Sequence, residues 1–275
     1  MNLLHALYFL TICLALPAGT IGIVSWRAPD RLKLGLLSRG FSSLAFLTAS
    51  GAWILRWIAS GHLPLFGTYE SSLSISVFCL GFGLAWDRIR GDLRAMPSTS
   101  LVAAVVLAQG IGYDPTPYAL TISERSLVVD AHAVLAWLAF GGCAASFGFA
   151  LKVLLTPNPR IGLTRAFSMS LSLAFVLQTA MIASGSIYKF MLFGTPWSFD
   201  PIETMAFIAW IAYGTILHMN LLAGWTGKKL ARWCLGVCAV AFLSYRVIVY
   251  FPSWSTYHIF DMDMRTHVIG GEVIE

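Results

Sequence analysis

An aromatic loop and the apolar helix after it hold the residues of this 275-residue chain that are best suited to chemistry. The loop, residues 193–199, is rich in Gly, Pro, Trp and Phe. Asp200 suits a helix cap, Pro201 the first helical position, and Glu203 can reach back to the cap. At about 1.5 Å per residue, the helix reaches His218 after roughly 27 Å, nearly the width of the hydrocarbon core. A loop at one membrane face and an imidazole near the other suit a flat, aromatic, metal-bearing group.

The composition indicates the kind of protein that positions these residues. The chain is 57% hydrophobic and 11% charged, whereas soluble domains carry about 25% charged residues. We therefore expect a polytopic membrane protein. Its net charge of +5 fits basic loops kept inside and requires no nucleic acid partner. The first apolar segment lacks a basic leader and a small-residue cleavage site, so it is expected to be a retained helix.

Five cysteines lie in apolar runs, and none forms a C-x-x-C pair. Each is expected to be a small buried hydrophobe. Cys234 and Cys238 share a helix face but lack further metal ligands. Without a C-x-x-C-H motif the chain is not itself a c-type cytochrome.

Apolar runs predict eight helices, at about residues 3–24, 40–58, 69–86, 97–112, 127–151, 167–188, 202–225 and 230–251. The run at 97–112 is short for a span. With eight crossings and both termini outside, 13 of the 18 basic residues lie inside; without 97–112, six of these 13 would lie outside. We expect an all-α polytopic membrane protein of about eight transmembrane helices, with a single domain over residues 1–275 and an irregular outer tail at 252–275.

This topology brings several side chains to the outer (periplasmic) face: His132, the loop before Asp200, and His258. A histidine in a membrane helix usually faces the bundle interior or a cavity. Trp197 and Phe199 could stack on a porphyrin edge, or they could belong to the interfacial aromatic belt.

Residues 193–205 resemble the tryptophan-rich "WWD" signature of haem-handling membrane proteins, most closely the CcsA/ResC subunit of the system II cytochrome c synthase. The likeness is closest over 197–203, and the helix ends in Leu-His as in that family. It departs at four positions, which hold Phe193, Pro196, Phe199 and Met205. A second resemblance, to the family's RWxxSGHxP…YES segment, covers residues 56–64 and 69–71.

The resemblance implies a set of ligands for haem b. His132, within an Asp-Ala-His segment that resembles the family's MH segment, and His258 would be the two outer axial ligands; neutral imidazole suits haem iron. Trp197, Phe199 and Asp200 would hold the haem edge. Interfacial histidines and a helix cap are the alternatives.

Two more residues have a role only through the resemblance. His218 would belong to an inner haem position, whose second ligand comes from a partner subunit, or it is structural. Arg56 would pair with a haem propionate, or it extends to the outer interface. His62 is not assigned a ligand role.

The function implied is haem presentation, at the outer face of a bacterial inner membrane, to an apocytochrome whose C-x-x-C-H thiols form thioethers with the vinyl groups. With a second membrane subunit the chain would act as a holocytochrome c synthase (haem lyase). The alternative is a non-enzymatic haem-binding anchor or electron-transfer subunit of a multihaem cytochrome complex. A third possibility is a regulator on the same scaffold without an outer haem.

Overall fold

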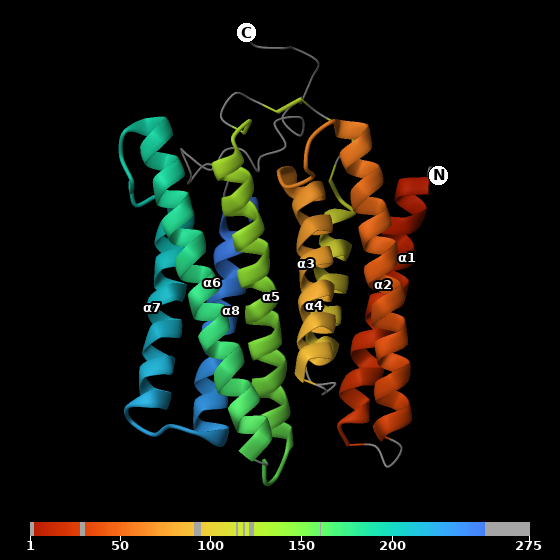
Figure 1. Cartoon of the computed structure of the whole chain (residues 1–275), viewed down its shortest axis with the longest axis vertical. Coiled ribbons are helices and arrows are strands. Elements are labelled where there is room, and N and C mark those ends of the chain that lie inside the picture. Colours follow the sequence, from red (N-terminus) through yellow and green to blue (C-terminus); the bar gives the residue numbers. More distant parts are fainter. Residues whose placement is uncertain are drawn as a thin grey trace.

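The computed structural model describes residues 3–27, 31–90, 95–113, 115–117, 119–120, 124–159 and 161–250. These residues form eight helices and no strand (Figure 1). The helices are α1 (Leu3–Ser25), α2 (Arg31–Ser60), α3 (Gly67–Arg90), α4 (Met96–Gly110), α5 (Leu127–Leu155), α6 (Ile161–Phe193), α7 (Pro201–Leu221) and α8 (Gly227–Tyr250). The predicted all-α class is confirmed.

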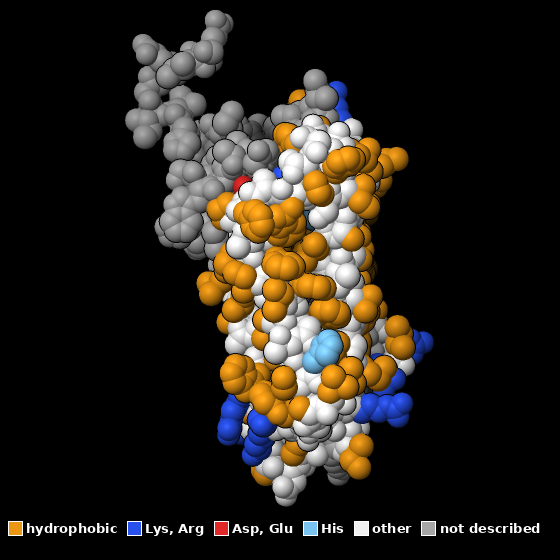
Figure 2. Space-filling view, turned by 90° about the vertical axis from the view of Figure 1, so that its left-hand side faces the viewer, with side chains coloured by type: hydrophobic (Ala, Val, Ile, Leu, Met, Phe, Trp, Pro, Cys, Tyr) orange, Lys and Arg blue, Asp and Glu red, His pale blue; other side chains and the backbone are white. Residues whose placement is uncertain are grey.

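Among the described residues, six helices are long and apolar enough to cross a membrane: α1, α2, α3, α5, α6 and α7. Helix α4 is apolar but has only 15 residues. Figure 2 shows the side that carries α7, with a broad band of apolar side chains and most of that side's lysine and arginine side chains below it. The protein is therefore an integral, polytopic membrane protein. Eight crossings and outer termini stay predictions.

The helices form two neighbouring groups, α1–α4 and α5–α8 (Figure 1). Helix α1 packs on α2 and α4, α5 packs on α6 and α8, and α7 packs mainly on α8. Contacts between α3 and α5 join the groups. Successive helices alternate in direction, so the N-terminus and the connections after α2, α4 and α6 lie at one end, the upper end in Figure 1.

Several helices extend beyond their predicted bounds. Helix α2 begins at Arg31 instead of residue 40, and α6 covers Ile161–Phe193 instead of 167–188. A basic residue that ends an apolar run does not end a helix, because the backbone bonds need no apolar side chain and Lys or Arg can extend to the headgroups. Helix α7 ends at Leu221, earlier than the predicted residue 225, and Gly224 follows with φ +66°.

Side-chain oxygens accept backbone N–H groups where two of the helices begin. Ser126 Oγ accepts a hydrogen bond from the Val128 N–H at 3.2 Å and so begins α5. Asp87, fully buried at the end of α3, accepts the N–H groups of Ala95 and Met96 at 3.2 Å. The carboxylate thus accepts backbone N–H groups that have no partner within α4, and it fixes the turn between α3 and α4.

The core of the α5–α8 group contains three of the cysteines, Cys143, Cys234 and Cys238. The Tyr213 hydroxyl lies 3.3 Å from the Cys238 sulfur. Four of the five cysteines are buried, as predicted, but Cys13 is exposed on α1. The prediction was wrong for Cys13 because an apolar run does not show which helix face packs inward.

Candidate functional site

A cavity of about 280 Å³ lies among α5, α6, α7 and α8 and extends to the start of α3. Its wall is mostly apolar. The wall residues differ in solvent exposure: Phe193 is 44% exposed, whereas Tyr213 is fully buried. The aromatic residues of the wall are Phe66, Trp137, Phe140, Tyr188, Phe193, Trp197 and Tyr213. The polar ones are Ser71, His132, Gln178, Ser186, Lys189, Glu203 and Ser244. An apolar, aromatic cavity with a few polar groups is typical of a small-molecule or cofactor site.

His132 lies in the second turn of α5 and lines this cavity. Its Nδ1 is 2.9 Å from the Met181 carbonyl oxygen of α6, and Ser184 Oγ is 3.4 Å away. A carbonyl can only accept, so Nδ1 is the donor and Nε2 of the neutral ring has the lone pair. Metal-binding histidines are commonly oriented by such a bond. The geometry of His132 therefore fits an axial ligand.

Gly185 makes room for this imidazole. A Cβ at Gly185 would lie 2.7 Å from Cε1 and 2.9 Å from Nδ1 of His132. Such contacts are too close, so any larger residue here would push the ring away from the Met181 carbonyl. Sequence reasoning missed Gly185, because only the packing of α5 on α6 reveals its role.

The aromatic loop contributes Trp197 to the cavity wall. The Trp197 ring makes edge contacts with Phe199 and Phe207, at centroid distances of 6.3 and 5.7 Å. Phe199 is 80% exposed, has φ +60° and is not among the lining residues. Asp200 is 4% exposed and accepts the Ile202 N–H at 3.0 Å. The predicted cap is confirmed, and of the three proposed loop residues only Trp197 lines the cavity.

Glu203 does not close the predicted capping box. Its Oε2 accepts the backbone N–H of Ser198 at 2.9 Å, and its Oε1 pairs with the ammonium of Lys189. Lys189 also donates to the Ser198 hydroxyl. The strong attraction of a buried ammonium draws the carboxylate toward Lys189 instead of the Asp200 amide.

Lys189 was missed because the predicted helix ended at Tyr188, which placed the lysine in a loop. The structure continues α6 through Lys189 to Phe193. A charged residue next to a membrane-helix run was the signal that could have revealed it.

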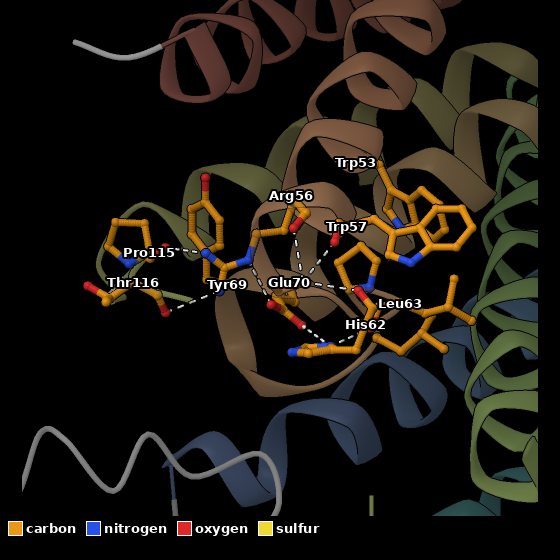
Figure 3. Close-up of polar contacts among 12 residues, drawn as sticks. Trp53, Arg56, Trp57, His62, Leu63, Tyr69, Glu70, Pro115 and Thr116 are labelled. Atoms are coloured by element: carbon orange, nitrogen blue, oxygen red, sulfur yellow. Dashed lines mark hydrogen bonds and ion pairs between the residues drawn. The ribbon is translucent and has the colours of Figure 1, made fainter. Parts of the chain in front are cut away.

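Arg56 is 1% exposed and lies outside the cavity lining. Its Nε is 2.7 Å from Glu70 Oε1, and its Nη2 is 3.2 Å from the Thr116 carbonyl oxygen (Figure 3). Its Nη1 donates to the Pro115 carbonyl, and the guanidinium lies over the Tyr69 ring. Arg56 thus joins α2, the start of α3 and the connection before α5.

Neither His218 nor His62 lines the cavity, and the position of His258 is not described. His218 is exposed on α7, with Nδ1 2.8 Å from the Gly214 carbonyl of its own helix, and it does not line the cavity. His62 Nδ1 is 3.0 Å from the Leu63 carbonyl oxygen and 3.9 Å from Glu70 Oε2. His258 falls outside the described residues. Within those residues no group of three His, Cys, Asp or Glu could hold a bare metal ion.

The family described as "Cytochrome C assembly protein" matches residues 36–257. The chain belongs to this family. The match includes every residue of the cavity wall and ends one position before His258. Membership gives the chain a role in the biogenesis of c-type cytochromes, and the predicted family is confirmed.

Three curated relatives of the chain are each named "Cytochrome c biogenesis protein CcsA". That of Parasynechococcus marenigrum (strain WH8102) is 24% identical over 270 residues, which covers 80% of the chain and 84% of the relative. That of Prochlorococcus marinus (strain AS9601) is 26% identical over 261 residues, with coverages of 81% and 82%. A shorter match, 45% over 60 residues, is to Prochlorococcus marinus (strain MIT 9301), covering 22% of the chain and 19% of the relative.

Proposed function

We propose that this cytochrome c assembly protein binds haem b in the cavity and presents it for attachment to an apocytochrome c. The observation that carries the proposal is the meeting of His132 and Trp197 in the wall of one aromatic cavity. Flat apolar surface, an oriented imidazole and a buried cation match the three parts of a haem: its ring, its iron and its carboxylates.

The role of each residue follows from its contacts. His132 would bind the iron through Nε2. The Met181 carbonyl accepts the hydrogen bond from Nδ1 and so fixes the orientation of the imidazole. Trp197 would cover the edge of the porphyrin, and the apolar wall would exclude water. His258 is proposed as the second axial ligand. When bound, haem supplies the vinyl groups to which cysteine thiols add.

The substrate must bring its own thiols, because this chain has no C-x-x-C-H motif. We propose that a second membrane subunit completes a holocytochrome c synthase in a bacterial inner membrane. The upper end of Figure 1 would be periplasmic, since this orientation keeps 13 of the 18 basic residues inside.

An absorption spectrum of the purified protein tests the proposal. We expect a b-type Soret band that weakens in His132→Ala and in His258→Ala and disappears in the double variant. The control is His5→Ala, which removes an imidazole from α1 outside the cavity wall. An unchanged Soret band in the double variant would overturn the ligand assignment.

One observation favours a second function, a haem-binding anchor or electron-transfer subunit of a multihaem cytochrome complex. Phe199, at a position where the family signature has tryptophan, is 80% exposed and outside the cavity wall. Co-purification distinguishes the two functions. A synthase partner with apocytochrome supports haem attachment, whereas a mature cytochrome complex supports the anchor.

A further inference from the structure

Lys189 of α6 and Glu203 of α7 form a buried ion pair in the cavity wall. Lys189 is 6% exposed and Glu203 is 8% exposed. The ammonium also donates to the Ser198 hydroxyl, and the Ser198 N–H donates to Glu203 Oε2 at 2.9 Å. The pair therefore joins two helices and the aromatic loop at the place where Trp197 meets the cavity.

The position of the lysine is unusual for a membrane protein. A lysine near the end of a membrane helix normally extends its ammonium to the interface, and α6 ends only four residues after Lys189. Here the side chain is buried among the cavity residues instead. A buried ion pair seldom stabilises a fold more than apolar packing would, and charged groups in membrane segments usually mark a functional site.

We infer that Lys189 binds a carboxylate of the cavity's ligand, which under the proposed function is a haem propionate. An ammonium is a compact charge with rotatable donors, so it can turn from Glu203 and Ser198 to an entering carboxylate. Glu203 keeps the Ser198 N–H when this happens. It also lies in the first turn of α7, where the helix dipole favours a negative charge.

Arg56 does not serve this role in the structure, because its guanidinium binds Glu70 and two carbonyls away from the cavity. In the described part of the chain, no lysine or arginine other than Lys189 lines the cavity. A ligand with a flat apolar body and a carboxylate edge fits this wall. The inference rests on the proposed function and adds the group that selects for the ligand's charge.

The experiment compares haem with its dimethyl ester, which has the same ring and iron but no carboxylates. Each is titrated into detergent-purified apoprotein, and the Soret change gives the affinity. We expect Lys189→Met to weaken haem binding by about tenfold or more, since bonds to charged groups are stronger than neutral ones. Ester binding should stay unchanged. Lys228→Met, an exposed lysine in the first turn of α8, is the control and should affect neither ligand.

A second variant guards against misfolding, because Lys189→Met leaves Glu203 buried without its cation. Lys189→Met/Glu203→Gln removes both charges and should fold, as judged by circular dichroism, while losing the preference for haem over the ester. If both variants still prefer haem over the ester, or if their affinities for haem and for the ester fall by the same factor, the inference is wrong. If the wild-type protein binds neither ligand, the proposed function itself fails, and this inference with it.

Discussion

His132 of α5 donates a hydrogen bond from Nδ1 to the main-chain carbonyl of Met181 on α6, over 2.9 Å. The bond joins two helices across the cavity wall and sets which ring nitrogen can bind a metal. Under the proposed function, it also makes haem binding depend on the spacing of α5 and α6. The first prediction follows from that spacing.

Gly185→Ala should displace the His132 ring. The new Cβ would lie 2.7 Å from Cε1, so the ring must leave the Met181 carbonyl. Loss of an orienting bond typically lowers metal affinity about 10- to 100-fold, while helix propensity rises by up to about 1 kcal/mol. Haem titration should thus show weaker binding without loss of helix content. Gly162→Ala, on the same helix with open space around it, should bind haem normally; equal affinities for the two variants would contradict the packing argument.

Trp197→Ala should lower haem binding, whereas Phe199→Ala should not. Trp197 lines the cavity, but Phe199 is 80% exposed and outside its wall. An aromatic contact of about 0.5–1.5 kcal/mol corresponds to a loss of roughly two- to tenfold. Haem per protein, measured by pyridine haemochrome, checks this. A fall in protein yield at constant haem content would show instead that Trp197 is an interfacial anchor.

Arg56→Ala should destabilise the fold. The change leaves the Glu70 carboxylate, which is 1% exposed, without its cation and frees the Pro115 and Thr116 carbonyls. Breaking a buried ion pair by removing one partner costs about 3–5 kcal/mol. Thermal unfolding in detergent should show a lowered midpoint, partly recovered in Arg56→Met/Glu70→Gln. A normal midpoint with weaker haem binding would favour the propionate role expected from the sequence.

His218→Ala should not change the spectrum of the chain expressed alone. His218 is exposed near the lower end of α7, while His5, His62 and His132 lie in the upper half of the bundle. Among the described residues no second histidine lies at that depth, and the predicted topology places His258 and His267 on the outer side, so we expect a bis-histidine site there to need a ligand from a partner chain. If the proposed partner subunit is co-expressed, the same variant should lose a haem. Detection of a second bis-histidine haem in the chain alone would refute this prediction.

The sequence alone predicts the architecture well. Membrane spans depend on the length of apolar runs, and the cap at Asp200 depends on neighbours one to three residues away. Such local properties can be read along the chain, and the structure confirms eight helices and the Asp200 cap. Helix ends were less well predicted, because α2 and α6 continue past the charged residues that close their apolar runs.

Tertiary structure alone decides which polar groups meet. Arg56 reaches Glu70 and the carbonyls of residues 115 and 116, and Lys189 reaches Glu203, because the helix faces that carry them are packed together. In a low-dielectric interior a buried charge must have a partner, but the sequence does not show which carboxylate that will be. Gly185 likewise acquires a role only where α6 contacts His132. The side chains that shape the cavity are therefore determined by contacts between distant segments, and these contacts depend on the packing of the whole bundle.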